Sequence, residues 1–170
     1  MSIERVWALD KGRVVSLTQF VALVGIATVV PFFHQQMITG PIVNATLFVA
    51  AALLGTQMAV FVGLIPSIIA LSVGTLPAPL APMVPYIMLS NAILILAFNA
   101  FREKQYWLAV GVASLFKFAF LWSMSSIVIG LLMKKELAES VALMMSWPQL
   151  LTALLGGVLA AIFLKHFQAR

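Results

Sequence analysis

One lysine, Lys117, is the residue of this sequence with the clearest capacity for chemistry. It lies ten residues beyond Trp107 in an apolar stretch, residues 107–133. In a helix that spacing corresponds to about 15 Å, close to the middle of a ~30 Å hydrocarbon core. An ammonium group at that depth costs about 2.5–3.5 kcal/mol on insertion scales. We therefore expect Lys117 to face the protein interior or a wet cavity rather than lipid.

Two interpretations of Lys117 follow from this position. In the first, it is a counter-ion or hydrogen-bond donor for an anionic group of a substrate. In the second, it is structural, and either caps the carbonyls of a broken helix or extends its long side chain toward the inner face. No acidic residue lies within any apolar stretch, so no intramembrane carboxylate can pair with it. The sequence leaves both interpretations open.

Three asparagines accompany this lysine in apolar stretches: Asn44, Asn91 and Asn99. A buried amide needs hydrogen-bond partners in lipid, so these side chains should face other helices. Asn91 is the deepest and could reach a ligand, whereas Asn44 and Asn99 lie nearer the ends and favour bonds between helices. Asn44 stays among the substrate-binding candidates. The other candidates lie at the outer ends of apolar stretches: His34, Tyr86, Trp147 and Gln149.

The residues that catalysis or metal binding would need are sparse. The chain has no cysteine, and His34 has no second histidine or carboxylate near it, which makes a metal site unfavourable. The five carboxylates lie at the termini or in loops, so paired acids within the membrane are missing. No phosphate-binding loop pattern occurs. We therefore expect neither an enzyme nor a bound cofactor or metal.

Composition places these residues in a membrane protein. Of 170 residues, 63% are hydrophobic and 9% charged, and the mean hydropathy is +1.11, values typical of a polytopic membrane protein. The net charge of +5 comes from basic residues that stand singly at the ends of apolar stretches, a pattern that indicates topology rather than nucleic-acid binding. We predict an all-α single membrane domain over residues 1–170, with six spans at about 14–33, 42–54, 58–73, 84–101, 107–133 and 147–164.

The second and third of these spans come from one long run without charge, residues 42–76. A single helix of that length would extend about 52 Å, so the run must fold back. Its one turn-like break is Gly55 with the two residues that follow. Pro41 is expected in the first turn of the second span, and Pro66 is expected to kink the third.

The distribution of lysine and arginine predicts that both termini are cytoplasmic. This orientation leaves seven basic residues inside and two, Lys134 and Lys135, outside. It also places the proline-rich segment 74–85 on the outer face. Proline fixes φ and lacks an N–H, so this segment should be stiff and non-helical, and it is predicted to form a wall of an outward-opening ligand pocket. The alternative is that prolines simply collect at helix ends.

Small residues form ridges on two of the predicted spans. Such ridges allow close helix packing, either inside the protein or against a partner. Gln149, Thr152 and Gly156 share one stripe of the sixth span, with its polar members at the outer end. A second ridge of that span consists of Ala153, Gly157 and Ala161. A weaker ridge on the first span consists of Thr18, Ala22 and Gly25.

Several motifs resemble the substrate-binding S components of energy-coupling factor (ECF) transporters, over nearly the whole chain. Six spans in about 170 residues, without a motor domain, fit that group. The resemblance is carried by residues 39–45 (TGPIVNA), Gly55 and Gly63, residues 83–92 (MVPYIMLSNA), Lys117 with Phe118, and residues 146–149 (SWPQ).

This resemblance implies a bacterial or archaeal inner-membrane protein that captures a vitamin-like or other micronutrient from outside. A transmembrane T component and two ATPase subunits would then drive its release, so ATP is used by the partners only. Docking in that family uses Ala-x-x-x-Ala on the first helix, where this sequence has Thr18-x-x-x-Ala22 and Gly25. Two alternatives stay open: a stand-alone small-solute permease or channel, and a membrane assembly protein without a ligand.

Overall fold

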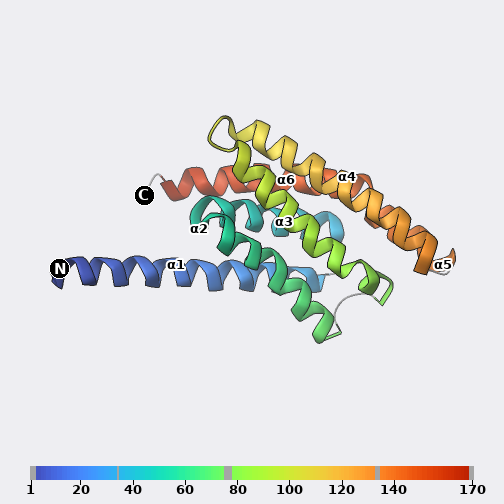
Figure 1. The fold of residues 1–170 in the computed structure, drawn as a ribbon, viewed down its shortest axis with the longest axis horizontal. Coiled ribbons are helices and arrows are strands. Elements are labelled where there is room, and N and C mark those ends of the chain that lie inside the picture. The colour runs from blue at the N-terminus through green and yellow to red at the C-terminus, as the bar shows by residue number, and fades with distance from the viewer. Residues whose placement is uncertain (1–2, 34, 75–77, 133–134, 169–170) are drawn as a thin grey trace.

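The computed structural model describes residues 3–33, 35–74, 78–132 and 135–168, and in them every regular element is a helix. The prediction of an all-α protein is therefore confirmed. Figure 1 shows long helices lying side by side, with short helical turns at one end of the bundle. The elements are α1 (Ile3–Val29), η1 (Val30–Phe33), α2 (Gln36–Ser72), η2 (Ala78–Met83), α3 (Val84–Phe101), α4 (Tyr106–Leu132), α5 (Lys135–Met144) and α6 (Trp147–Gln168), where η marks a 3-10 helix.

The predicted reversal in the long uncharged run occurs at Gly55. This residue has φ 80° and ψ 175°, the one interruption of helical geometry within α2. Because glycine lacks a Cβ, it adopts positive φ without the steric cost that another residue would meet. Figure 1 shows the two halves of α2 running in opposite directions from this break. Residues 36–54 and 56–72 are thus two rods of about 28 Å and about 25 Å.

The start of α2 differs from the prediction. The helix begins at Gln36, so Pro41 lies in its second turn rather than its first. The polar residues before Pro41 had indicated a loop, but the backbone of Ile38 and Thr39 already bonds to the Gln35 carbonyl. Proline is tolerated here because it removes only one helical hydrogen bond, and Pro41 packs in the interior against α6.

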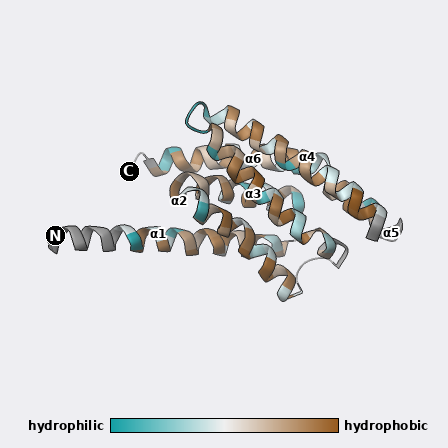
Figure 2. Ribbon diagram, in the orientation of Figure 1, coloured by the Kyte–Doolittle hydropathy of each residue, from teal (hydrophilic) through white to brown (hydrophobic). Residues whose placement is uncertain are grey.

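The chain is a multi-pass membrane protein by the length and apolarity of its helices. Five helices of the described part, with α2 taken as one, are long and apolar enough to cross a membrane. Large apolar side chains cover their outer faces, among them Leu96, Phe116 and Trp122, each more than half exposed. Figure 2 shows hydrophobic residues along the helices and hydrophilic ones at the loop between α3 and α4. Lipid, rather than water, suits such a surface.

The two ends of the bundle differ in character. Figure 1 shows the N- and C-terminal ends at the same end, together with the break in α2 and the short turn between α3 and α4. The opposite end carries η1, η2 and α5. The proline-rich segment was predicted to be non-helical, and this is wrong for Ala78–Met83, which form η2. Proline fits a short 3-10 turn at positions where its missing N–H is not needed, so this segment does not have to be extended.

Two apolar clusters hold the bundle together. The larger contains Leu47, Phe48 and Phe98, all almost fully buried, with the two phenylalanine rings 4.9 Å apart in an edge-to-face arrangement. The smaller one joins η2, α4, α5 and Met145, the residue after α5, and Tyr86 of α3 packs against it. It consists of Met83, Leu121, Val128, Val141 and Met145.

α6 packs closely against α2 and α4 because its small residues allow close approach on two sides. A Cβ added at Gly156 would lie 2.6 Å from the Asn44 Cβ and 2.9 Å from the Ala45 backbone N of α2. A Cβ at Gly157 would collide with Val110 of α4. The stripe and the ridge predicted on this helix are therefore both internal packing faces.

Arg102 caps the first half of α2, near the break at Gly55. Its Nη1 donates to the carbonyl oxygens of Ala51 (2.8 Å) and Ala52 (3.4 Å), close to the break at Gly55. Asn99 Nδ2 donates to Thr56 Oγ1 at 2.9 Å, so the predicted role of Asn99 in joining helices is confirmed. Carbonyls at a helix end need such donors, and a charged donor strengthens the bond.

Arg102→Met is expected to lower the free energy of unfolding by about 1–2 kcal/mol, since it removes charge-assisted bonds to a half-buried helix end. The measurement is the thermal unfolding midpoint in detergent. Lys104→Met, a change of an exposed cation in the same turn, is the matched control and should leave the midpoint in place. Equal effects of the two variants would show that Arg102 does not stabilise the break.

Candidate ligand-binding site

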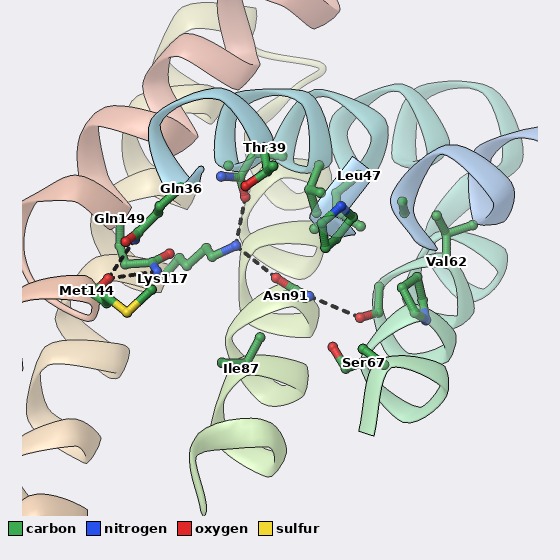
Figure 3. Close-up of a pocket in the computed structure, with 18 of the residues that line it drawn as sticks. Gln36, Thr39, Leu47, Val62, Ser67, Ile87, Asn91, Lys117, Met144 and Gln149 are labelled. Carbon is green, nitrogen blue, oxygen red and sulfur yellow. Dashed lines mark hydrogen bonds between the residues drawn. The ribbon is translucent and has the colours of Figure 1, made fainter. Parts of the chain in front are cut away.

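Lys117 lies near the middle of α4 and is 4% exposed. Its Nζ donates to Asn44 Oδ1 at 2.7 Å and to Asn91 Oδ1 at 2.8 Å. In Figure 3 the lysine side chain extends between Thr39 and Asn91. Both bonds are short enough to be strong, and each joins the ammonium to a helix other than its own. Lys117 is therefore an ammonium held by two amide oxygens, and both interpretations of its role start from this geometry.

Asn91 extends this arrangement to a fourth segment. Its Nδ2 donates to the Gly63 carbonyl oxygen at 3.0 Å. Gly63 lies in the second half of α2, where an added Cβ would be 3.1 Å from the Asn91 Cβ. We call Asn44, Asn91 and Lys117, with the Gly63 carbonyl, the lysine–amide cluster. It joins both halves of α2 to α3 and α4, and it fixes the position of the ammonium.

The partners of Lys117 in this cluster are neutral. All five carboxylates of the chain are distant in sequence from the mid-span residues, at positions 4, 10, 103, 136 and 139. Of these, Glu103 and Glu139 are exposed in the structure. A buried ammonium with amide partners alone has its hydrogen bonds partly satisfied but its charge uncompensated. Such a group favours an additional anionic or strongly dipolar partner.

The lysine–amide cluster forms one wall of a cavity of about 250 Å³. Most of the cavity wall is apolar, with a few polar groups, which is the usual constitution of a small-molecule site. The apolar residues that line it come from α1, η1, both halves of α2, α3, the end of α5 and the residue that follows it. They are Ala27, Pro31, Val43, Leu47, Val62, Pro66, Ala70, Ile87, Met144 and Met145.

A second polar group of the cavity lies where α5 ends. Gln36 Nε2 and Gln149 Nε2 both donate to the Met144 carbonyl oxygen, at 2.7 Å and 3.0 Å. Figure 3 shows the two glutamines meeting at Met144, beside Lys117. These bonds satisfy a carbonyl of the last turn of α5 and connect the starts of α2 and α6. Each glutamine keeps its amide oxygen for a further donor.

Two hydroxyl groups also line the cavity, those of Thr39 and Ser67. No hydrogen bond from either hydroxyl, or from Asn44 Nδ2, occurs among the residues that the structure describes. These donors are therefore available to a ligand. The chemistry of the site is recognition by hydrogen bonding and charge, since the cavity wall carries amides, hydroxyls and one ammonium.

The structure brings together four of the residues selected from the sequence: Asn44, Asn91, Lys117 and Gln149 all line the cavity. Trp147 is 57% exposed and Tyr86 packs in the smaller apolar cluster, so neither lines it. His34 lies outside the described residues. Direct contact with a substrate stays a prediction for the whole set. Residues 81–85, the described side chains of the proline-rich segment, do not line the cavity.

Sequence reasoning did not select Gln36, Thr39, Ser67 or Met144. Gln36 and Thr39 stand near Pro41, in a polar stretch that resembled a loop. Nothing in the sequence indicated that a helix begins there and turns both side chains toward the cavity. Met144 contributes through its backbone carbonyl, which no residue type indicates. Ser67, next to Pro66, was the one hydroxyl in the middle of its apolar stretch and could have been noticed.

Comparison with known proteins gives no match to a family model, to a curated protein or to a solved structure. In the described part of the chain, no three histidine, cysteine or acidic side chains gather where they could hold a metal ion.

Proposed function

We propose that this protein captures a small molecule within the membrane for uptake, as the S component of an ECF-type importer. The observation that carries the proposal is Lys117, an ammonium held by two amide oxygens at the wall of an apolar cavity. A charge so deep in a membrane protein is costly, and a ligand that binds to it is the most direct reason for its presence. The sequence resemblance supplies the transporter class.

The proposed ligand is a vitamin-like or other small micronutrient, taken up from outside across a bacterial or archaeal cytoplasmic membrane. Purification of the tagged protein from a host that carries a complete ECF system tests this. Co-purification of a transmembrane T component and two ATPase subunits supports the proposal. Solute flux through liposomes that contain this chain alone, without ATP, would instead indicate a stand-alone permease or channel.

The proposed docking face is on α1, where Thr18, Ala22 and Gly25 are exposed. A Cβ at Gly25 would have no atom within 4 Å, so a partner helix has space to approach. Ala22→Trp should therefore abolish co-purification of the T component. Leu17→Trp, on another side of the same helix, is the matched control and should retain it. Retention by both variants would remove α1 from the interface without touching the ligand site.

Six membrane crossings with both termini in the cytoplasm are part of the proposal, because each half of α2 has about the length of a hydrocarbon core. The absence of cysteine from the sequence permits a direct test. A single cysteine in place of the exposed Glu139 of α5 should react with a membrane-impermeant maleimide in intact cells. One in place of Glu103, in the turn between α3 and α4, should react only after permeabilisation. The reverse pattern would invert the topology, and the unmodified chain is the blank.

A further inference from the structure

At the lysine–amide cluster itself, the ammonium and the Asn44 amide leave N–H donors open, whereas the free acceptor oxygens of Gln36 and Gln149 lie at the end of α5. Asn44 Oδ1 and Asn91 Oδ1 already accept from the lysine, whose ammonium has three N–H groups and donates two of them to these oxygens. Asn44 Nδ2 and the hydroxyls of Thr39 and Ser67 add further donors at the cavity wall. A ligand group that meets this part of the cavity must therefore accept hydrogen bonds. Carboxylates, phosphates and carbonyl oxygens meet this requirement, and protonated amines do not.

The charge of the cavity narrows the choice among these ligand groups. Lys117 is the one charged side chain among the described residues that line it. One negative charge would neutralise the ammonium, which is buried and therefore weakly screened by water. A phosphate monoester carries close to two charges at neutral pH and would leave about one uncompensated. A neutral amide would leave the ammonium charge as it is. A single carboxylate fits the site best.

The rest of the ligand is defined by the other walls. Ten of the lining residues are apolar, from Ala27 to Met145, so most of a bound ligand would contact hydrocarbon side chains. The volume of about 250 Å³ lies below the ~300–1,000 Å³ usual for drug-sized ligands. The oxygens of Gln36 and Gln149 allow one donor group, such as a hydroxyl, on the ligand body.

We infer that the ligand is a small organic acid with one carboxylate and a mainly apolar body, and that the carboxylate binds Lys117, Asn44 Nδ2 and the Thr39 hydroxyl. This inference rests on the proposed function and adds the chemical class of the substrate. The carboxylate would join α2 and α4 at the lysine–amide cluster, where the helices already meet.

The test is a matched set of probes: phenylacetate, phenylacetamide, phenethylamine and benzyl phosphate, with hexanoate and hexanamide as an aliphatic pair. Binding is measured by calorimetry on the full chain in nanodiscs, with empty nanodiscs as the blank for partitioning into lipid. We expect at least one carboxylate to bind at least tenfold more tightly than its amide, and the amine and phosphate to bind more weakly than the carboxylate. Equal or tighter binding of the amide, the amine or the phosphate, or no binding by either carboxylate, overturns the inference.

A variant of the protein tests the role of the Lys117 charge without removing the lysine. Asn44→Asp keeps the shape of the side chain and places a carboxylate beside Lys117, so it should compete with the ligand for the ammonium. We expect the affinity for the bound carboxylate to fall at least tenfold. Gln57→Glu adds the same charge at an exposed site near the break in α2 and is the matched control. An unchanged affinity in Asn44→Asp would contradict a carboxylate at Lys117.

The outcome also separates this inference from the proposed function. A neutral or cationic molecule retained by the purified protein would overturn the carboxylate class and leave a substrate-capture role intact. Carboxylate binding without any T component or ATPase partner would support the ligand class and remove the ECF assignment. Mass spectrometry of the purified protein in both ion modes, together with the co-purification described above, distinguishes the two results.

Discussion

Replacing Lys117 with methionine is expected to weaken ligand binding about 10- to 100-fold and to change the stability of the ligand-free protein little. A hydrogen bond to a charged group contributes about 1.5–3 kcal/mol, which sets the loss of affinity. Stability changes little because two effects oppose each other. The variant leaves Asn44 Oδ1 and Asn91 Oδ1 without a donor, at about 1–3 kcal/mol each, but it also removes a buried charge that costs about 2.5–3.5 kcal/mol.

The measurements for Lys117→Met are calorimetric binding of the retained or identified ligand and the thermal unfolding midpoint without ligand. Lys165→Met is the matched control, since that lysine is exposed near the end of α6. It should leave both quantities unchanged. The opposite pattern for Lys117→Met, strongly lowered stability with full ligand affinity, would mean that the lysine is structural. The cavity would then have to bind through Gln36, Gln149 and the hydroxyls alone.

The second large effect is expected for Gly156→Ala. The added Cβ would lie 2.6 Å from the Asn44 Cβ, 2.9 Å from the Ala45 N and 3.0 Å from the Pro41 carbonyl oxygen. Two of these atoms are backbone, so they cannot rotate away and α6 must shift from α2. Overpacking of this kind costs about 1–3 kcal/mol, more than alanine gains over glycine in helix propensity. Because Asn44 lies at this contact and also bonds Lys117, ligand affinity should fall as well.

Gly111→Ala is the matched control for Gly156→Ala, because a Cβ at Gly111 of α4 meets no atom within 4 Å. The control should be neutral or stabilising by up to about 1 kcal/mol. Unfolding midpoints and ligand affinities of the two alanine variants are compared directly. A Gly156→Ala protein as stable as the Gly111→Ala protein, with unchanged affinity, would contradict the role assigned to the contact between α6 and α2.

The extent to which the sequence predicted this arrangement can be followed at particular residues. The reversal at Gly55 was predictable because a charge-free run of about 52 Å cannot cross a ~30 Å core in one pass. Lys117 and Asn91 were identifiable because ionisable and amide groups are expensive in an apolar stretch and need partners. What could not be predicted was that Asn44, 73 residues from Lys117, is one of those partners. That contact depends on packing across α2, α4 and α6.

The predictions for residues at the ends of helices were less accurate, for a physical reason. Trp147 and Tyr86 stand at helix starts, where a small rotation decides whether a side chain lies over the cavity, at the surface or in the packed core. Trp147 is exposed and Tyr86 is packed beside η2. The proline-rich segment resembled a stiff loop because prolines oppose α-helix, but Ala78–Met83 adopt 3-10 turns instead.

Occupancy of the cavity tests the central claim most directly. The protein is purified from its membrane in mild detergent, and the small molecules released on denaturation are identified and counted by mass spectrometry. We predict about one molecule of a single organic acid per chain in the unmodified protein, and its loss in Lys117→Met with retention in Lys165→Met. No retained molecule in any of the three proteins, or equal retention in all of them, would contradict a ligand site built around Lys117.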